Sequence, residues 1–407
     1  MRTVFERAAF WLTCGSIVTG LFSIAVSHIL LGLALVALLG SGLKLRFPPF
    51  WLPLTVFIAG TIVSMAASAD PASGRPQLRK FFVFVILLCA ASVLTGMRRV
   101  RWLLITIAAA AGLSALRALI QFVEKYERSI SMGQGFYQSY VSDRITGFMS
   151  HWMTFSSQAM YGFLIMVALL LFGGGLFKRA WLWGLCAAIL GAALVLGFTR
   201  IVWLGSAAGT IYLLACWRPK WLFALPVAAA AGFWLAPDFV RARVQSAVTP
   251  NGELDSNQHR IITLRTGLRM IEAHPWLGLG PEQVNARFNE FIPPDVPQPL
   301  PSGWYGHLHN IYVHYAAERG IPTLLALVWM LGMIARDLFL AVRSDPRPTS
   351  DEKFILHSGL AVLGATLVVG VMEHNLGDSE VLMLFLAIVA CAYTARDSLR
   401  ASAQANG

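Results

Sequence analysis

Long apolar runs dominate this chain and restrict it to folds embedded in a membrane. Of its 407 residues, 57% are hydrophobic and 13% are charged, which is more apolar than a water-soluble domain of this length requires. A helix needs about 20 apolar residues to cross a bilayer. Runs near that length predict twelve spans, at residues 9–27, 29–43, 50–68, 81–96, 102–123, 155–174, 180–198, 202–216, 221–236, 320–341, 354–372 and 381–394. The sequence therefore predicts an all-α polytopic membrane protein with about twelve transmembrane helices.

Basic residues between the runs predict how the chain is oriented. Lysine and arginine in short loops stay on the cytoplasmic side of a membrane. Counting alternately from a cytoplasmic N-terminus makes every predicted inside loop basic, with Lys44 and Arg46 in one loop and Arg98, Arg99 and Arg101 in the next. The charges inside therefore need no explanation beyond topology and anionic lipid.

The same alternation places three polar segments outside, at residues 124–154, 237–319 and 373–380. The longest, 237–319, is expected to be a large loop domain. We therefore expect three parts: residues 1–236 with nine spans and the outer loop 124–154, residues 237–319 as the outer loop domain, and residues 320–407 with three spans and a short cytoplasmic tail.

Several cations lie outside against the usual bias. Such a set suggests an anionic ligand, for which a lipid-linked phosphate at the membrane surface is the obvious kind, although ordinary surface charge balanced by acids is the alternative. The residues are Arg75, Arg79, Lys80, Arg144, Arg200, Arg260 and Arg265. Arg200 follows an apolar run, and an arginine there is costly unless an anion pairs with it or it only anchors the interface.

Motifs that bind nucleotides or metals are absent from the sequence. It contains no GxxxxGK[ST], no HExxH and no paired CxxC. We therefore expect no metal, no cofactor and no nucleic-acid partner.

A helix is predicted in the large loop. Asp255 and Gln258 resemble a capping box, and His274-Pro275 would end the helix. An apolar stripe with helical spacing, made by Ile261, Leu264, Leu268 and Ile271, is expected to pack on the membrane domain. Arg260 and Arg265 would flank that surface, either to offer paired donors to a phosphate or as arginines snorkelling around a docked helix.

Histidines precede the tenth span. His309 and Asn310 open a predicted helix, whose dipole would keep the His309 imidazole neutral and able to accept a proton. His307 would orient a substrate, and His314 is expected to be ordinary packing. Trp304 and Tyr305 suit either an interfacial belt or sugar stacking.

A second His-Asn pair lies in the outer hairpin from Glu373 to Glu380. The hairpin is rich in acids. It is either a simple turn, or it balances the outer arginines, or it touches a polar acceptor. Glu373 and Asn375 are its candidate binding residues.

The block from Arg260 to Pro281, followed by His309-Asn310 and Gly320, resembles the signature region of the O-antigen ligase and polymerase family. These are bacterial inner-membrane enzymes that act on undecaprenyl-diphosphate-linked glycans. In that family a His-Asn pair is followed, after nine intervening residues, by Gly-x-x-Gly, and here Thr323 replaces the second glycine. Further resemblances are the segment Arg144–His151 and the pair Thr199-Arg200.

The resemblance implies a GT-C-like fold and a metal-independent, inverting glycosyl transfer. Arginines 200, 260 and 265 would hold the diphosphate, because fixed guanidinium donors stabilise the charge that develops on a leaving oxygen. His309 would deprotonate the acceptor hydroxyl from the opposite face of the sugar, which inverts the anomeric carbon. The residues expected to contact substrate are His307, Asn310, Trp304, Tyr305, Arg144, His151, Glu373 and Asn375.

The first hypothesis is therefore an O-antigen ligase, a multi-pass protein of the bacterial inner membrane with its site facing the periplasm. Its expected partners are an undecaprenyl-diphosphate-linked glycan as donor, lipid A-core as acceptor, and membrane lipids. An O-antigen or exopolysaccharide polymerase of the same fold is the nearest alternative. A lipid or polysaccharide transporter is a third, but it should carry midplane ionisable sites and repeated halves, whereas the polar candidates here cluster at the outer face.

Overall fold

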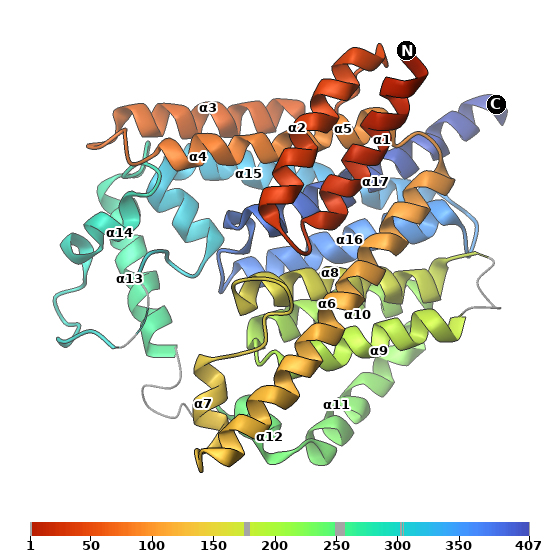
Figure 1. Cartoon of the computed structure of the whole chain (residues 1–407). Coiled ribbons are helices and arrows are strands. Elements are labelled where there is room, and N and C mark those ends of the chain that lie inside the picture. The colour runs from red at the N-terminus through yellow and green to blue at the C-terminus, as the bar shows by residue number, and fades with distance from the viewer. Residues whose placement is uncertain (1, 175–179, 249–256, 302, 304, 407) are drawn as a thin grey trace.

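The structure is a bundle of helices, in which many of the long helices run in a similar direction and others cross them at a steep angle (Figure 1). The computed structural model describes residues 2–174, 180–248, 257–301, 303 and 305–406, and over these residues it contains helices and no strands. The α-helices are α1 (Arg2–Thr19), α2 (Ile24–Ser41), α3 (Trp51–Ala67), α4 (Arg75–Lys80), α5 (Val85–Val93), α6 (Met97–Ser131), α7 (Phe136–Ser142), α8 (Trp152–Phe172), α9 (Ala180–Leu196), α10 (Arg200–Trp217), α11 (Ala224–Leu235), α12 (Asp238–Gln245), α13 (Asn257–Ala273), α14 (Gln283–Arg287), α15 (Ile311–Ser344), α16 (Asp351–Gly370) and α17 (Ser379–Asn406). Short 3₁₀ helices are η1 (Phe81–Phe84), η3 (Pro219–Phe223), η5 (Phe288–Phe291) and η6 (Asn375–Gly377).

The prediction of a polytopic membrane protein is confirmed, but the count of twelve spans is not. Eight helical segments in the described part of the chain are long and apolar enough to cross a membrane, and three further apolar helices have only 10–17 residues. The first predicted span, α1, belongs to neither group; it carries Arg2, Glu6 and Arg7 within its first six residues.

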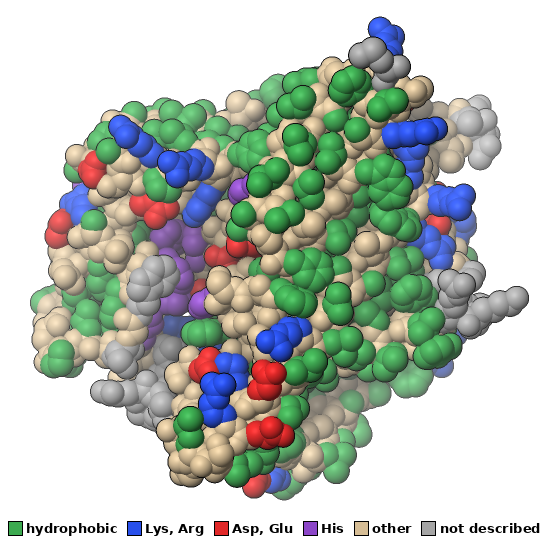
Figure 2. Space-filling model, in the orientation of Figure 1, with side chains coloured by type: hydrophobic (Ala, Val, Ile, Leu, Met, Phe, Trp, Pro, Cys, Tyr) green, Lys and Arg blue, Asp and Glu red, His purple; other side chains and the backbone are tan. Residues whose placement is uncertain are grey.

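Apolar side chains are exposed at many places on the face of the bundle in Figure 2. On α2, for example, Ile29 is 64% exposed and Val36 is 65% exposed. Exposing such faces to water would cost about 25 cal/mol per Å², so a lipid environment explains them. The bundle therefore has the surface of a membrane-embedded domain.

The centre of the bundle is formed by α8, α16 and α17, whose residues are mostly buried. The Tyr161 hydroxyl of α8 lies 2.8 Å from Thr366 Oγ1 of α16. On α10, a Cβ at Gly205 would lie 2.7 Å from Val369 Cγ2, so the glycine lets α10 approach α16 closely. This packed centre fixes the loop between α16 and α17, which carries part of the candidate site.

A break in α15 at Gly320 joins the polar segment to the bundle. Gly320 has φ 80° and ψ 162°, a conformation available essentially only to glycine, and a Cβ there would collide with the Trp276 carbonyl. The loop after α13 bonds to the backbone around the break, with Leu279 N donating to Ala317 O at 2.8 Å and Ile321 N donating to Pro275 O at 2.8 Å. The spacing from Asn310 to Gly320 therefore sets the length of the first part of α15.

Thr323, which stands where the Gly-x-x-Gly pattern has its second glycine, contacts a residue of α3. The side chain of Thr323 packs directly against Gly60, where any Cβ would overlap it. A glycine on the facing helix thus makes room for the larger residue on α15.

A small second core holds the polar segment together. Its buried members come from α13, the loop after it, and the start of α15. They are Ile262, Met270, Leu279, Val284, Phe288, Val296, Leu308 and Ala317. The polar segment is therefore packed against the chain that leads into α15, beside the histidines.

Candidate active site

A cavity of about 610 Å³ lies between α13, the start of α15, the start of α8 and the loop between α16 and α17. In the space-filling view, histidines gather in a hollow with acidic side chains beside them (Figure 2). Among the described residues it is lined by six histidines, five acids and three cations: His151, His259, His307, His309, His314 and His374; Glu282, Glu318, Glu373, Asp378 and Glu380; Lys80, Arg144 and Arg260.

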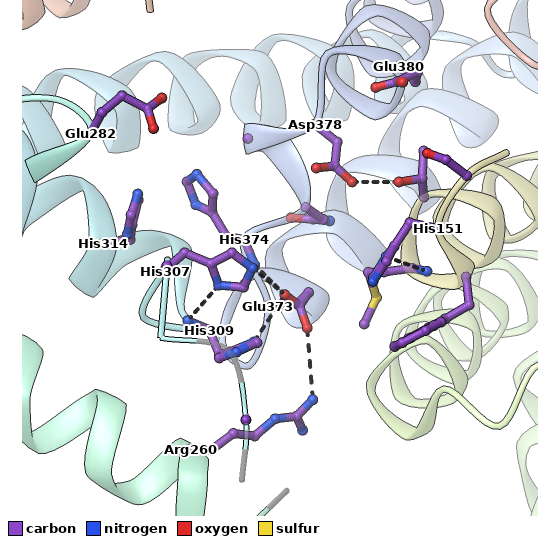
Figure 3. Close-up of a pocket in the computed structure, with 18 of the residues that line it drawn as sticks. His151, Arg260, Glu282, His307, His309, His314, Glu373, His374, Asp378 and Glu380 are labelled. Atoms are coloured by element: carbon purple, nitrogen blue, oxygen red, sulfur yellow. Dashed lines mark hydrogen bonds and ion pairs between the residues drawn. The ribbon is translucent and has the colours of Figure 1, made fainter. Parts of the chain in front are cut away.

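Glu373 is the centre of the polar contacts (Figure 3). Its side chain is buried, and its Oε1 lies 3.3 Å from His309 Nδ1 and 3.7 Å from His307 Nε2. Its Oε2 lies 3.9 Å from Arg260 Nη2. One carboxylate from the α16–α17 loop thus connects two histidines before α15 with an arginine on α13.

The backbone around His309 is held in an unusual conformation. His309 has φ 47°, a left-handed conformation that few residues other than glycine adopt. Its backbone N–H lies 3.3 Å from His307 Nδ1. Asn310 caps α15 by accepting from Tyr312 N and Val313 N, and its Nδ2 donates to Val371 O at 2.8 Å. His309 therefore precedes the helix, and the prediction that it lies in the first helical turn is wrong.

The charges around Glu373 favour its ionised form. Burial alone raises the pKa of Glu373, but the hydrogen bond with His309 and the charges of His309, His307 and Arg260 outweigh burial and lower that pKa to about 2. Burial, then the charge of His309, lowers the pKa of His307 to about 3. The contacts of Glu373 therefore favour its ionised form, and burial favours the uncharged form of His307.

The second nitrogen of His309 is available for chemistry. His309 Nε2 is buried and has no hydrogen-bond partner among the described residues. When Nδ1 donates its proton to Glu373, Nε2 carries the lone pair and accepts protons. A carboxylate behind an imidazole also stabilises the imidazolium that forms when a proton is taken up.

Guanidinium groups lie on one side of this centre. Burial lowers the pKa of Arg260, and its Nε has no hydrogen-bond partner among the described residues. Arg144 lies with its guanidinium carbon 5.0 Å from the centre of the Trp152 ring. Burial, then the positive charges of Arg243 and Arg260, lowers the pKa of Arg144 to about 9, so it remains charged at neutral pH. Such a group of cations is stabilised by an anion bound beside it.

Arg200 is a neighbour of this cation group and does not line the cavity. It begins α10, where its Nη1 donates to Ser246 O at 2.7 Å and its Nη2 donates to Asn257 Oδ1 at 2.9 Å. It is among the positive charges that act on Arg144. Arg200 therefore ties α12 and α13 to the bundle.

Arg265 lies away from the cavity. It is exposed and makes two hydrogen bonds to Asp295, at 2.9 and 2.7 Å. Arg260 and Arg265 are five residues apart, which separates them by about 140° around a helix. The helix predicted around them is confirmed as α13, which ends before His274-Pro275, while Asp255 of the capping box is outside the described residues.

The expected packing of α13 is wrong. Its predicted apolar stripe faces outward, with Ile261 57% exposed and Leu268 52% exposed. The buried face instead carries His259, Ile262 and Met270 among others. An apolar stripe on a membrane protein need not face protein, because lipid and headgroups also accept apolar side chains.

The remaining predicted residues divide between the cavity and structural roles. His151, His307 and Asn375 line the cavity. Tyr305 donates to Pro301 O at 2.8 Å and packs on His259 without lining the cavity. Trp304 lies outside the described residues.

Sequence reasoning missed several lining residues. His314 was expected to be packing, and His259, Glu282 and Asp378 were not expected at the site, but all four line the cavity. Asp378 lies in the same acidic hairpin as Glu373, which is the one signal in the sequence that pointed to it.

Three side chains around the cavity's centre, those of His307, His309 and Glu373, are of the kinds that bind transition metals. One ligand atom each from His307, His309 and Glu373 lie within 4.8 Å of one another, and imidazole and carboxylate are common ligands of zinc.

Comparison with known proteins gives a family match for one part of the chain. Residues 185–328 match the family model described as O-antigen ligase, and no curated protein matches the chain. The match includes Arg260, His309 and Gly320, whereas Glu373 and Asp378 lie beyond it. Family members are glycosyltransferase-like enzymes that act on lipid-linked glycans. Residues 185–328 of this multi-pass membrane protein are thus similar to the O-antigen ligase family.

Proposed function

We propose that the protein is an O-antigen ligase that moves a glycan from undecaprenyl diphosphate to a hydroxyl of lipid A-core, at the periplasmic face of a bacterial inner membrane. One observation carries the proposal. His309 presents an Nε2 that has no hydrogen-bond partner in the described part of the chain, and it contacts Glu373 through Nδ1, in the cavity that also holds Arg144 and Arg260.

The proposed reaction is a single displacement. The acceptor oxygen forms a bond to the anomeric carbon while its proton passes to His309 Nε2. The bond from that carbon to the diphosphate oxygen breaks, and its electron pair remains on the diphosphate. Arg260 and Arg144 would stabilise the charge that develops there, while Glu373 stabilises the imidazolium. Attack from the side opposite the leaving group inverts the configuration.

Arg200 enters the proposal as a positioning residue, and Arg265 does not enter it. Arg200 holds the chain on either side of residues 249–256 through Ser246 and Asn257. Arg265 has its donors bound to Asp295 outside the cavity.

Incubation of the purified protein with an undecaprenyl-diphosphate-linked glycan, with and without lipid A-core, tests the proposal. We expect glycan joined to the core in the reaction that contains the core, and no glycan product in the reaction without it. Longer lipid-linked glycan formed without the core would instead indicate the polymerase. The absence of any transfer would contradict both activities.

Arg260→Lys is expected to lower transfer by about 100-fold, because removing one donor that stabilises a developing oxyanion costs roughly 10²–10³ in rate. Lysine keeps the charge but loses the planar pair of donors. Initial rates at saturating donor measure the effect. Arg265→Lys on the same helix is the matched control and should keep transfer within about twofold of the wild type; equal losses in both variants would remove Arg260 from the proposal.

Treatment with EDTA is expected to leave transfer unchanged, because guanidinium groups supply the charge that a metal would otherwise supply to the leaving group. Transfer is measured before and after EDTA and again after a divalent ion is added back. Loss of transfer with EDTA, restored by the ion, would contradict the metal-independent reaction and would assign a metal to His307, His309 and Glu373.

A further inference from the structure

The cavity has two sides of opposite chemistry. In Figure 3, Arg260 lies on one side of Glu373, and Glu282, Asp378 and Glu380 lie on the other. The charged residues that act on Arg144 and on Asp378 show the same division. The positive charges acting on Arg144 are Arg243, Arg260 and Arg200, whereas the largest charges acting on Asp378 are Glu380 and Glu373.

The acidic side is assembled from five distant parts of the chain. Glu282 accepts from Gln77 Nε2 and lies 3.9 Å from Lys80 Nζ of α4. The backbone N–H of Glu282 donates to Glu318 Oε1 of α15 at 2.7 Å. From the α16–α17 loop, Asp378 accepts from Thr154 Oγ1 at 2.8 Å. These bonds fix carboxylates at the cavity wall, so the acidic side is a built surface.

Polar atoms on this side lack partners within the described chain. His314 Nδ1, His374 Nδ1 and Asn375 Nδ2 are buried without a hydrogen bond there, and His314 and Asn375 are at most 5% exposed. An unsatisfied buried polar group is destabilising, and a ligand that supplies its partner removes that cost. Sugar hydroxyls both donate and accept, so they suit a wall that mixes carboxylate, imidazole and amide groups.

Charge decides which sugar fits. Glu282, Glu318, Asp378 and Glu380 line this side together with Lys80, and the buried Arg319 lies 3.7 Å from Glu318. Burial, then the charges of Glu380 and Glu373, raises the pKa of Asp378 to about 6. A phosphate or carboxylate on the bound sugar would be repelled there, whereas hydroxyls would be held.

We propose that the acidic side, formed by Glu282, Asp378, Glu380, His314 and His374, is the acceptor subsite and binds a hydroxyl-rich terminal sugar that carries no phosphate. This assignment rests on the proposed function, which places the donor diphosphate on the arginine side. The two substrates then meet at His309 and Glu373, which lie between the two sides. Glu282, Asp378 and Glu380 determine which acceptor is used, because they would contact it and not the donor.

Binding of two soluble probes to the full chain in lipid nanodiscs tests the subsite without requiring transfer. The probes are a deacylated, dephosphorylated core oligosaccharide for the acidic side and inorganic pyrophosphate for the arginine side. Glu380→Gln is the main variant, because Glu380 makes no side-chain hydrogen bond within the described chain and glutamine has nearly the same size. Glu282→Gln is the second variant, and the exposed Glu272→Gln on α13 is the control.

A crossed pattern is expected. Glu380→Gln and Glu282→Gln should each raise the Kd of the oligosaccharide by about tenfold and leave the Kd of pyrophosphate within twofold. Arg260→Lys should raise the Kd of pyrophosphate by about tenfold and leave the Kd of the oligosaccharide within twofold. The same oligosaccharide with a phosphate on its terminal sugar should bind the wild type at least about tenfold more weakly. Glu272→Gln should change neither Kd.

Two results separate this inference from the proposed function. Oligosaccharide binding that is unchanged in both glutamine variants overturns the acceptor subsite, even in a protein that transfers glycan. The crossed pattern in a protein that transfers no glycan supports the subsite and overturns the ligase activity.

Discussion

His309→Ala is expected to reduce glycan transfer about 10³-fold, because a positioned general base contributes on the order of 10²–10⁴ in rate. The variant loses the Nε2 that would take the acceptor proton and the Nδ1 that contacts Glu373 at 3.3 Å. It keeps Arg144 and Arg260, so the donor should still bind. Rates of transfer and binding of pyrophosphate, measured on the same preparation, separate the two effects.

His274→Ala is the matched control for that experiment. His274 follows α13 and packs near Phe291, 6.1 Å between ring centres, and it does not line the cavity. Its replacement should leave transfer within about twofold of the wild type. Transfer by His309→Ala at the rate of the control would exclude His309 as the base.

Gly320→Ala is expected to prevent correct assembly of the site. A side chain at this φ and ψ costs roughly 1–3 kcal/mol in backbone strain, and its Cβ would also collide with the Trp276 carbonyl. The backbone bonds from Leu279 and Ile321 depend on the same close approach. The variant should lose most folded protein, or should show a clearly lower melting temperature together with loss of transfer.

Gly332→Ala on the same helix separates strain from a general effect of alanine. Gly332 is helical, and a Cβ there meets nothing within 4 Å. Its melting temperature should equal or slightly exceed that of the wild type, because alanine favours a helix over glycine by about 1 kcal/mol. A Gly320→Ala protein as stable and active as Gly332→Ala would contradict the role of the break.

The sequence predicted the parts of the fold that depend on local pattern. The apolar runs predict a membrane protein, and the residues around His274-Pro275 predict the end of α13. Twelve spans were expected because run length alone was counted, whereas α1 begins with charged residues and α3 and α9 each have 17 residues.

The site was only partly predictable for the same physical reason. His309 and Arg260 lie in a recognisable block, but their distance to Glu373 depends on packing between residues far apart in the chain. The acidic side was harder to predict from the sequence, because no common sequence pattern links Gln77, Glu282 and Thr154. Arg265 was predicted as a site residue because helical periodicity gives the position of a residue around the helix but does not show which face of the helix packs against the rest of the protein.

A structure of the protein in nanodiscs with a bound undecaprenyl-diphosphate-linked glycan tests the central claim most directly. We expect the diphosphate within hydrogen-bond distance of Arg260 and Arg144, with the anomeric carbon facing His309. A diphosphate bound elsewhere, for example in the cavity lined by Arg7, Arg98 and Arg99, would contradict the account.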